Sequence, residues 1–300
     1  MAHCLKFNSD VNSEVHQFVT CARRLVRDVY PRVREAVAAD SRKPQTKADG
    51  SFVTEIDIAV ETYFTDELRK AFPSVLVLGE EAAAEESVKG VTEPHRYYAA
   101  FMQSPLQIVI DPIDGTKNFV EGKAEFCIAA ALTSRTSAGI WPVAGLVAVP
   151  VEGVMYWCDE TDVYREEIES GAMNRIERVP SAKIRLSVNS KDRAWLAEHK
   201  FEIVHPWVSS GSSVHDFIGT ALGELQGSMV CKQRLWDLMA PLAIAERLGC
   251  ALVDFSTGEP VRSVTPVDLS PDLEHRPWGL MRRMMLVGSG VRVADLIRTK

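Results

Sequence analysis

The stretch DPIDGTKNF, from Asp111 to Phe119, decides how the rest of the chain is interpreted. It follows the apolar run Gln107–Ile110, which predicts a buried strand, and it places two carboxylates on a Pro-containing turn directly after that strand. Gly115 allows a tight bend that brings backbone amides close to a ligand. Short acidic spacing on a rigid turn suits a hard cation such as Mg²⁺, although solvated turns also favour Asp, Pro and Gly.

A second pair of acids, Glu80 and Glu81, stands at the end of another short apolar run, Val75–Leu78. Glutamate pairs in loops are more commonly solvated than functional. Here, however, the same architecture occurs twice, because a buried strand again delivers acids at its end. Strand ends are also where the sites of α/β proteins collect.

Two further segments place acids at the starts of helices. Asp237 opens an apolar helix over residues 237–248, and capping a helix is an ordinary role for Asp. In KADGSFVTEID, from Lys47 to Asp57, the side chains of Thr54 and Asp57 fit a capping box that opens another helix. An Asp held by a Thr is also a well-oriented base, so capping and catalysis are compatible at this position.

The composition bounds the class of protein. The 300 residues, 46% of them hydrophobic, are ample to bury a core as one large domain or two joined lobes. A formal net charge of -7 without a dense basic block argues against a nucleic-acid polymer as ligand. Six scattered cysteines indicate reduced thiols and a cytoplasmic protein. No secretory signal and no apolar stretch long enough to span a bilayer are recognised.

Hydrophobic periodicity predicts the order of the elements. In the first half we expect helices over residues 11–37 and 56–68, a loop or hairpin over 38–53, a partly helical insertion over 82–104, and strands over 126–132, 143–149 and 153–158. After about residue 160 helices and strands alternate, with strands over 184–188, 251–255 and 284–287 and a helix carrying Phe217, Ala221 and Leu225. We therefore expect two lobes, residues 1–158 and 159–300, that share one interface and act as one functional unit.

Taken together, the segments KADGSFVTEID, GEE, DPIDGTKNF and WDLMAPLAIAERLG resemble the inositol monophosphatase superfamily in their order and approximate spacing. This superfamily includes histidinol-phosphate phosphatases, bisphosphate nucleotidases and archaeal-type fructose bisphosphatases. The resemblance spans roughly residues 10 to 290. It implies an α+β fold with layers in the order α/β/α/β/α, Mg²⁺-dependent hydrolysis of a small phosphate monoester, a homodimer, and inhibition by lithium.

The resemblance also implies a role for each matching residue. The implied ligands of two or three Mg²⁺ ions are Glu80, Asp111, Asp114, Asp237 and the carbonyl of Ile113. Asp57 and Thr116 would orient the attacking water as the catalytic pair. The residues implied to receive the substrate are Asp114, Gly115, Thr116 and Ser212. Glu81 and Lys47 would support the metal ligands without binding the ions themselves.

Physical chemistry agrees with the metal assignment. Each pair of like charges about 4 Å apart costs about 4 kcal/mol at an effective dielectric constant of 20, so four carboxylates do not crowd together unpaired. Two divalent ions relieve that cost, lower the pKa of a bound water, and clamp the phosphoryl oxygens. We therefore expect in-line attack by metal-activated water, with Thr116 as a water-orienting hydroxyl rather than a covalent nucleophile.

The substrate stays open at this level. Inositol-specific members carry a glutamate where this chain has Val230, and without that acceptor a tight polyol fit is disfavoured. Lys232 adds a positive charge, although a solvated lysine is the more ordinary interpretation. The run SSGSSVHD, residues 209–216, resembles the bisphosphate nucleotidase branch, but Ser is also a common helix cap. Sugar phosphates, histidinol phosphate, inositol phosphates and nucleotide 3'-phosphates remain, and the alternative of another class is a non-catalytic anion-binding or regulatory protein.

Overall fold

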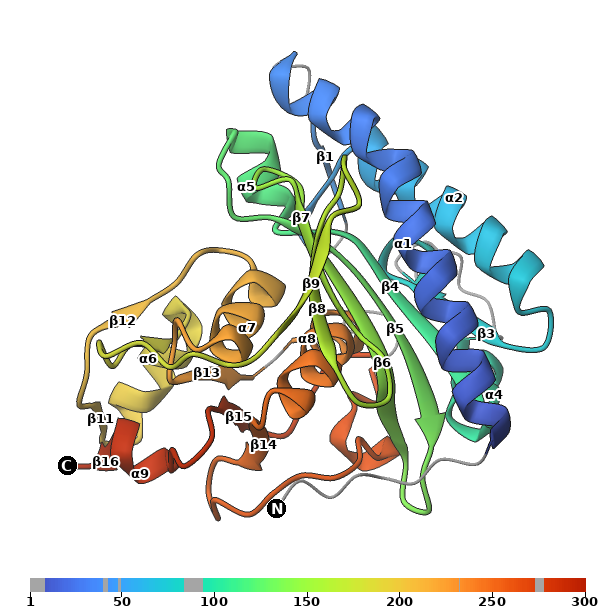
Figure 1. Cartoon of the computed structure of the whole chain (residues 1–300). Coiled ribbons are helices and arrows are strands. Elements are labelled where there is room, and N and C mark those ends of the chain that lie inside the picture. The colour runs from blue at the N-terminus through green and yellow to red at the C-terminus, as the bar shows by residue number, and fades with distance from the viewer. Residues whose placement is uncertain (1–8, 40–42, 48–49, 84–93, 232, 273–277) are drawn as a thin grey trace.

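The described part of the chain is built in layers, in the order helices, sheet, helices, sheet, helices (Figure 1). The computed structural model describes residues 9–39, 43–47, 50–83, 94–231, 233–272 and 278–300. One apolar cluster lies outside the first sheet, one fills the centre between the two sheets, and one lies outside the second sheet. This is the α/β/α/β/α sandwich that the sequence predicts.

The first sheet has seven strands in the order β3-β4-β5-β6-β7-β8-β9. Their bounds are β3 (Leu76–Gly79), β4 (Leu106–Asp114), β5 (Cys127–Arg135), β6 (Ile140–Val149), β7 (Val154–Cys158), β8 (Val163–Glu167) and β9 (Met173–Ile176). Strands β3 and β4 are parallel and the later neighbours are antiparallel. The sheet therefore continues past residue 158, and the division of the chain into lobes at that residue stays a prediction.

Two long helices cover the outer face of this sheet, α1 (Ser9–Ala38) and α2 (Glu55–Ala71). Strand residues such as Ile108 and Ile110 join their apolar cluster, because alternate side chains of a strand point to the same face. The predicted capping box of Thr54 and Asp57 is present at the start of α2. Helix α1 continues through Pro31, and the predicted loop or hairpin before α2 contains the antiparallel pair β1 (Gln45–Thr46) and β2 (Phe52–Val53).

The inner face of the first sheet carries the central helices α4 (Pro94–Gln103), α7 (Ser213–Leu222) and α8 (Leu235–Arg247). Leu225, which the sequence places on a helix, lies beyond α7, because the helix ends at Gly223 with a left-handed backbone. Helix α8 approaches β6 closely at Gly145, where a Cβ atom would lie 2.9 Å from the Cβ atom of Ala243. Most of the predicted insertion, residues 84–93, lies outside the described residues.

The second sheet has five strands in the order β12-β10-β13-β15-β14. Their bounds are β10 (Leu186–Ser187), β12 (Trp207–Val208), β13 (Gly227–Val230), β14 (Ala251–Asp254) and β15 (Met284–Val287). Its outer side is covered by α6 (Ser190–Glu198), α9 (Val293–Leu296) and the antiparallel pair β11 (Phe201–Ile203) and β16 (Ile297–Thr299). A short 3-10 helix, η1 (Pro266–Asp268), follows β14.

Replacing Gly145 by Ala tests the close approach of α8 to β6. The added methyl group would overlap the carbonyl of Ala240, so we expect the free energy of unfolding to fall by about 1–3 kcal/mol. Denaturant unfolding followed by circular dichroism measures the change. Ser137→Ala, at an exposed position before the same strand, serves as the control. An unchanged unfolding midpoint for Gly145→Ala would contradict the expectation.

Candidate metal centre

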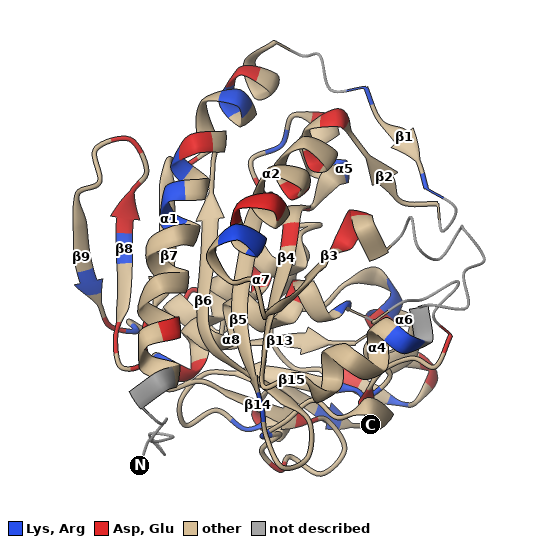
Figure 2. Ribbon diagram, turned by 90° about the vertical axis from the view of Figure 1, so that its right-hand side faces the viewer, with Lys and Arg blue, Asp and Glu red and all other residues tan. Residues whose placement is uncertain are grey.

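Three carboxylates from distant parts of the sequence meet in the centre of the molecule. Asp111 and Asp114 end strand β4, and Asp237 lies in the first turn of α8. One oxygen from each of the three lies within 4.8 Å of the other two. The register of β4 shifts between Asp111 and Asp114, which allows both acids to face the site. In Figure 2 acidic segments of β4, of α2 and of the turn after β3 are seen near one another.

Asp111 is buried without a hydrogen-bond partner among the described residues. Its side chain is 1% exposed, and neither carboxylate oxygen has a hydrogen-bond partner within the described part of the chain. Burial raises the pKa of Asp111 well above its ordinary value, and the charges of Glu80 and Asp114 raise it further. A buried carboxylate without a partner is costly, so this group fits a cation. Its hard oxygen donors fit Mg²⁺ or another small divalent ion.

Asp114 is tied to the start of helix α7. Its Oδ2 atom accepts hydrogen bonds from the hydroxyl of Ser212 and, at 3.0 Å, from the backbone N–H of Val214. Burial raises the pKa of Asp114 to about 7 although both hydrogen bonds lower it. Ser212, which the sequence assigns to the substrate, therefore contacts a predicted metal ligand and also caps α7.

Asp237 occupies the third position of α8 rather than the cap. Arg234 is the N-cap residue, and its backbone N–H donates a 2.8 Å hydrogen bond to the carboxylate of Asp237. Burial raises the pKa of Asp237 well above its ordinary value, followed by the charges of Asp114 and Glu80. Asp237 is therefore not the N-cap residue, although its carboxylate binds a helix-terminal amide and also lies close to the other acids.

Glu80 and Glu81 follow β3 in a helical turn over residues 80–83, where Lys47 binds both. The Nζ atom of Lys47 lies 2.7 Å from Oε1 of Glu80 and 2.8 Å from Oε1 of Glu81. Burial disfavours the charged lysine, but the charges of the two glutamates raise the pKa of Lys47 above its ordinary value. Burial also raises the pKa of Glu81 to about 8. In Asp111, Asp114 and Asp237, where burial is the main cause of the raised pKa, the negative charge of Glu80 raises the pKa further.

Asp57 and Thr116 lie side by side, as the sequence predicts for a catalytic pair. The hydroxyl of Thr116 lies 3.1 Å from Oδ1 of Asp57 and 3.0 Å from the carbonyl oxygen of Ile113. The other oxygen of Asp57 is held by the backbone N–H of Thr54 at 2.9 Å and by its hydroxyl. Burial raises the pKa of Asp57 to about 6.

Gly115 shapes the turn between the strand and the short helix α5 (Thr116–Glu121). Its φ angle of +85° lies in the left-handed region, which favours glycine. A Cβ atom there would lie 2.9 Å from the Cβ atom of Ser212 and 3.0 Å from the carbonyl oxygen of Glu125. Only glycine therefore brings this turn so close to the segment before α7.

Two contacts at the site were not predicted from the sequence. Glu61, 4% exposed, accepts the backbone N–H groups of Glu81 at 2.8 Å and Ala82 at 2.7 Å, and burial raises its pKa to about 7. The amide of Asn118 donates to the carbonyl oxygens of Glu125 at 2.7 Å and Ser210 at 2.8 Å. Glu61 had one local signal, because a charged residue four positions after Asp57 falls on the same buried face of α2.

Three positions bear on the choice of substrate: Val230, His215 and Lys232. Val230 is fully buried in β13 within the central cluster, so this position offers no polar group. His215 contributes its backbone N–H to the hydroxyl of Ser212 at 3.1 Å. Lys232 lies outside the described residues.

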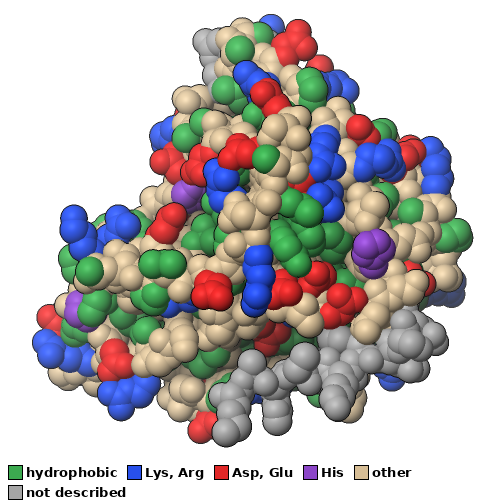
Figure 3. Space-filling view, viewed as in Figure 1, with side chains coloured by type: hydrophobic (Ala, Val, Ile, Leu, Met, Phe, Trp, Pro, Cys, Tyr) green, Lys and Arg blue, Asp and Glu red, His purple; other side chains and the backbone are tan. Residues whose placement is uncertain are grey.

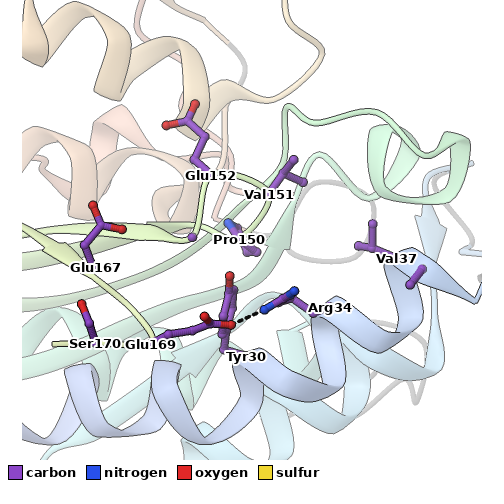
Figure 4. A pocket seen from close by; sticks show the side chains of 11 residues that line it. Tyr30, Arg34, Val37, Pro150, Val151, Glu152, Glu167, Glu169 and Ser170 are labelled. Carbon is purple, nitrogen blue, oxygen red and sulfur yellow. Dashed lines mark hydrogen bonds and ion pairs between the residues drawn. The ribbon is translucent and has the colours of Figure 1, made fainter.

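A surface groove of about 550 Å³ lies between α1 and the turns after β6 and β8 (Figure 4). None of the predicted site residues lines it. Three of its charged side chains are in ion pairs, Arg34 with Glu169 and Glu167 with Arg165. The buried carboxylates, rather than this groove, therefore mark the candidate site.

The chain is similar in sequence to known phosphatases. It is 33% identical over 229 residues to the 3'(2'),5'-bisphosphate nucleotidase CysQ of Escherichia coli, covering 74% of this chain and 85% of that protein. It is 38% identical over 118 residues to the histidinol-phosphatase of Streptomyces coelicolor, covering 39% of this chain and 38% of that protein. Among solved structures, the Thermotoga maritima IMPase matches with a TM-score of 0.61 and 18% identity, covering 90% of this chain and 91% of that chain.

The layered fold and the buried carboxylates at its strand ends define a class, the phosphoric monoester hydrolases that depend on divalent metal ions. The model of the inositol monophosphatase family matches residues 14–285. The chain belongs to the inositol monophosphatase family, as its sequence motifs predict.

Replacing Asp111 by Asn tests the electrostatic argument without any substrate. In metal-free buffer we expect the variant to be more stable than the wild type by about 1–3 kcal/mol, because an uncompensated buried charge is removed. Adding Mg²⁺ should raise the melting temperature of the wild type and leave that of the variant almost unchanged. Thermal unfolding in EDTA and in MgCl₂ measures both effects.

Asp66→Asn, which removes an exposed carboxylate of α2, is the matched control for this comparison. It should respond to Mg²⁺ as the wild type does. Equal melting temperatures of wild type and Asp111→Asn in EDTA would contradict the claim that Asp111 is an uncompensated charge.

Proposed function

We propose that this protein hydrolyses a small phosphate monoester with Mg²⁺, held by the carboxylates of Asp111, Asp114, Asp237 and Glu80 and by the carbonyl of Ile113. The observation that carries the proposal is Asp111, a fully buried carboxylate whose oxygens have no partner in the described chain. A divalent ion supplies the missing charge. Two or three ions would match the number of acids.

The chemistry of the chain's own groups follows from the contacts of Thr116. When bound, the ions would supply positive charge to the phosphate and acidity to water. The hydroxyl of Thr116, between Asp57 and the carbonyl of Ile113, would orient the attacking water. Asp57 would accept a proton through this hydroxyl, since its second oxygen is already fixed by Thr54. The water oxygen would then bond to phosphorus as the bond from phosphorus to the ester oxygen breaks. The ester oxygen would take a proton from solvent to leave as the alcohol, and Asp57 would return its proton to solvent.

Among substrates we favour a nucleotide 3',5'-bisphosphate. The similarity to CysQ extends over most of both chains, whereas the similarity to histidinol-phosphatase covers 39% of this chain. Val230, buried and apolar, offers no acceptor for the hydroxyls of inositol. Among the described side chains on the face seen in Figure 3, acidic and basic groups are interspersed, which supports a small substrate rather than a nucleic-acid polymer.

A homodimer in the cytoplasm is part of the same proposal. The described cysteines are free and buried, which supports a reducing compartment. None of the described helices is long and apolar enough to cross a membrane. The homodimer rests on the family resemblance, and light scattering on the purified protein measures it against a monomer of 33.3 kDa.

Phosphate release from a panel of esters tests the activity. The panel contains inositol phosphate, histidinol phosphate, fructose bisphosphate and adenosine 3',5'-bisphosphate. We expect release in Mg²⁺, none in EDTA, and the highest kcat/KM for adenosine 3',5'-bisphosphate. Asp111→Asn should lose the activity and Asp66→Asn should keep it. Release that persists in EDTA would overturn the metal assignment, and no release from any ester would favour the anion-binding alternative.

Thr116→Ala and Thr116→Ser test whether hydrolysis needs the hydroxyl at this position. Thr116→Ala should lower kcat by about 10²–10⁴-fold, because the water loses its orienting group. Thr116→Ser keeps the hydroxyl and should retain most of the activity. Steady-state kinetics at saturating Mg²⁺ measure both variants. A phosphorylated Thr116 trapped during turnover would show a covalent route instead.

A further inference from the structure

The turn that presents Glu80 is fixed from outside by a carboxylate of another helix. Residues 80–83 form a helical turn after β3, and the N–H groups at the start of a helix have no partners within it. The two carboxylate oxygens of Glu61 bind two of these groups separately, Oε2 the N–H of Glu81 and Oε1 the N–H of Ala82. A side chain of α2 thus caps a turn about twenty residues later in the chain, in the manner of an N-cap.

Gly79 completes this arrangement. A residue directly before a helical turn usually supplies the cap with its own Ser, Thr, Asp or Asn side chain. Here that position is a glycine, and a Cβ atom on it would overlap the carboxylate of Glu61, 2.7 Å from Oε2. The φ angle of Gly79 is not in the left-handed region, so backbone strain does not demand glycine here. The space for the carboxylate of Glu61 is what excludes a side chain.

The location of Glu61 gives this contact a consequence for the site. Glu61 lies four residues after Asp57 on α2, and Asp57 contacts Thr116. Helix α2 therefore places Asp57 beside Thr116 and, one turn later on the same face, Glu61 against the turn of Glu80. Lys47 orients the side chain of Glu80, whereas Glu61 fixes the backbone from which that side chain projects.

We propose that Glu61 is a positioning residue that sets Glu80 as a metal ligand by capping residues 80–82, and that Gly79 is required to admit it. The proposal rests on the function proposed above, since it takes Glu80 to bind the ion. Replacing a group that is hydrogen-bonded to a metal ligand typically lowers metal affinity by about 10–100-fold. The expected loss is therefore in metal affinity rather than in the chemical step.

Mn²⁺ binding, measured as free Mn²⁺ by electron paramagnetic resonance, tests the proposal directly. Glu61→Gln keeps the size of the side chain but can accept only one of the two N–H groups, so its Kd for Mn²⁺ should rise about 10–100-fold. The Mg²⁺ concentration for half-maximal activity should rise in parallel, while kcat at saturating Mg²⁺ stays close to that of the wild type. Glu55→Gln, an exposed glutamate of α2, is the matched control and should change neither.

Gly79→Ala gives a second route that leaves Glu61 in place. Its added methyl group displaces the carboxylate, so its Kd for Mn²⁺ should also rise. In a Glu61→Ala background the same glycine substitution should add little further loss, because the overlapping group is gone. Additive losses in the double variant would overturn the role assigned to Gly79.

Failure of the role proposed for Glu61 can be distinguished from failure of the proposed phosphatase function. A Glu61→Gln protein that folds, hydrolyses esters and binds Mn²⁺ with the wild-type Kd overturns the proposal. A Glu61→Gln protein with normal Mn²⁺ affinity but a reduced kcat also overturns it, because the loss would then lie in chemistry. A wild type that binds Mn²⁺ and hydrolyses no ester overturns the proposed function, while the Mn²⁺ titrations still decide the role of Glu61.

Discussion

The structure depends on the mutual repulsion of carboxylates buried in one place. One oxygen each of Asp111, Asp114 and Asp237 lies within 4.8 Å of the others, and Asp111 and Asp114 are buried whereas Asp237 is partly exposed. At an effective dielectric constant of 20, each close pair of unit charges costs several kcal/mol. Such an arrangement is relieved by protonation, which the raised pKa values express, or by positive charge, of which a divalent ion would be a compact source. The fold is therefore built to hold acids together until a cation relieves them.

Helix termini are the means by which the fold holds these acids in place. Asp114 accepts an N–H at the start of α7, Asp237 one at the start of α8, and Asp57 one at the start of α2. Each carboxylate thus uses one oxygen for a helix end, where partial positive charge favours it. In Asp57 the other oxygen accepts a hydrogen bond from the hydroxyl of Thr116. The hydrogen bonds that cap these helices therefore also fix the positions of the site carboxylates.

Much of this could be predicted from the sequence, because strands that end in acids and capping boxes are local patterns. The turn after β4, the helix of Asp237 and the pair of Asp57 and Thr116 follow from spacing and from the family resemblance. Strands β8 and β9 were missed since their apolar pattern is weak, and Glu166 in β8 is buried against Arg23 and Trp157. The contacts of Glu61 were missed because they join a side chain to a backbone in another element, which no local pattern encodes.

The separation of Asp111 and Asp237 along the chain has a consequence for biosynthesis. Strand β4 and its turn leave the ribosome long before helix α8, and the acids of β4 then have no partner from the second half of the chain. Non-local contacts of this kind form late in folding. A nascent or truncated chain that lacks α8 therefore lacks the carboxylate of Asp237, and the three aspartates come together only once α8 has packed against the first sheet.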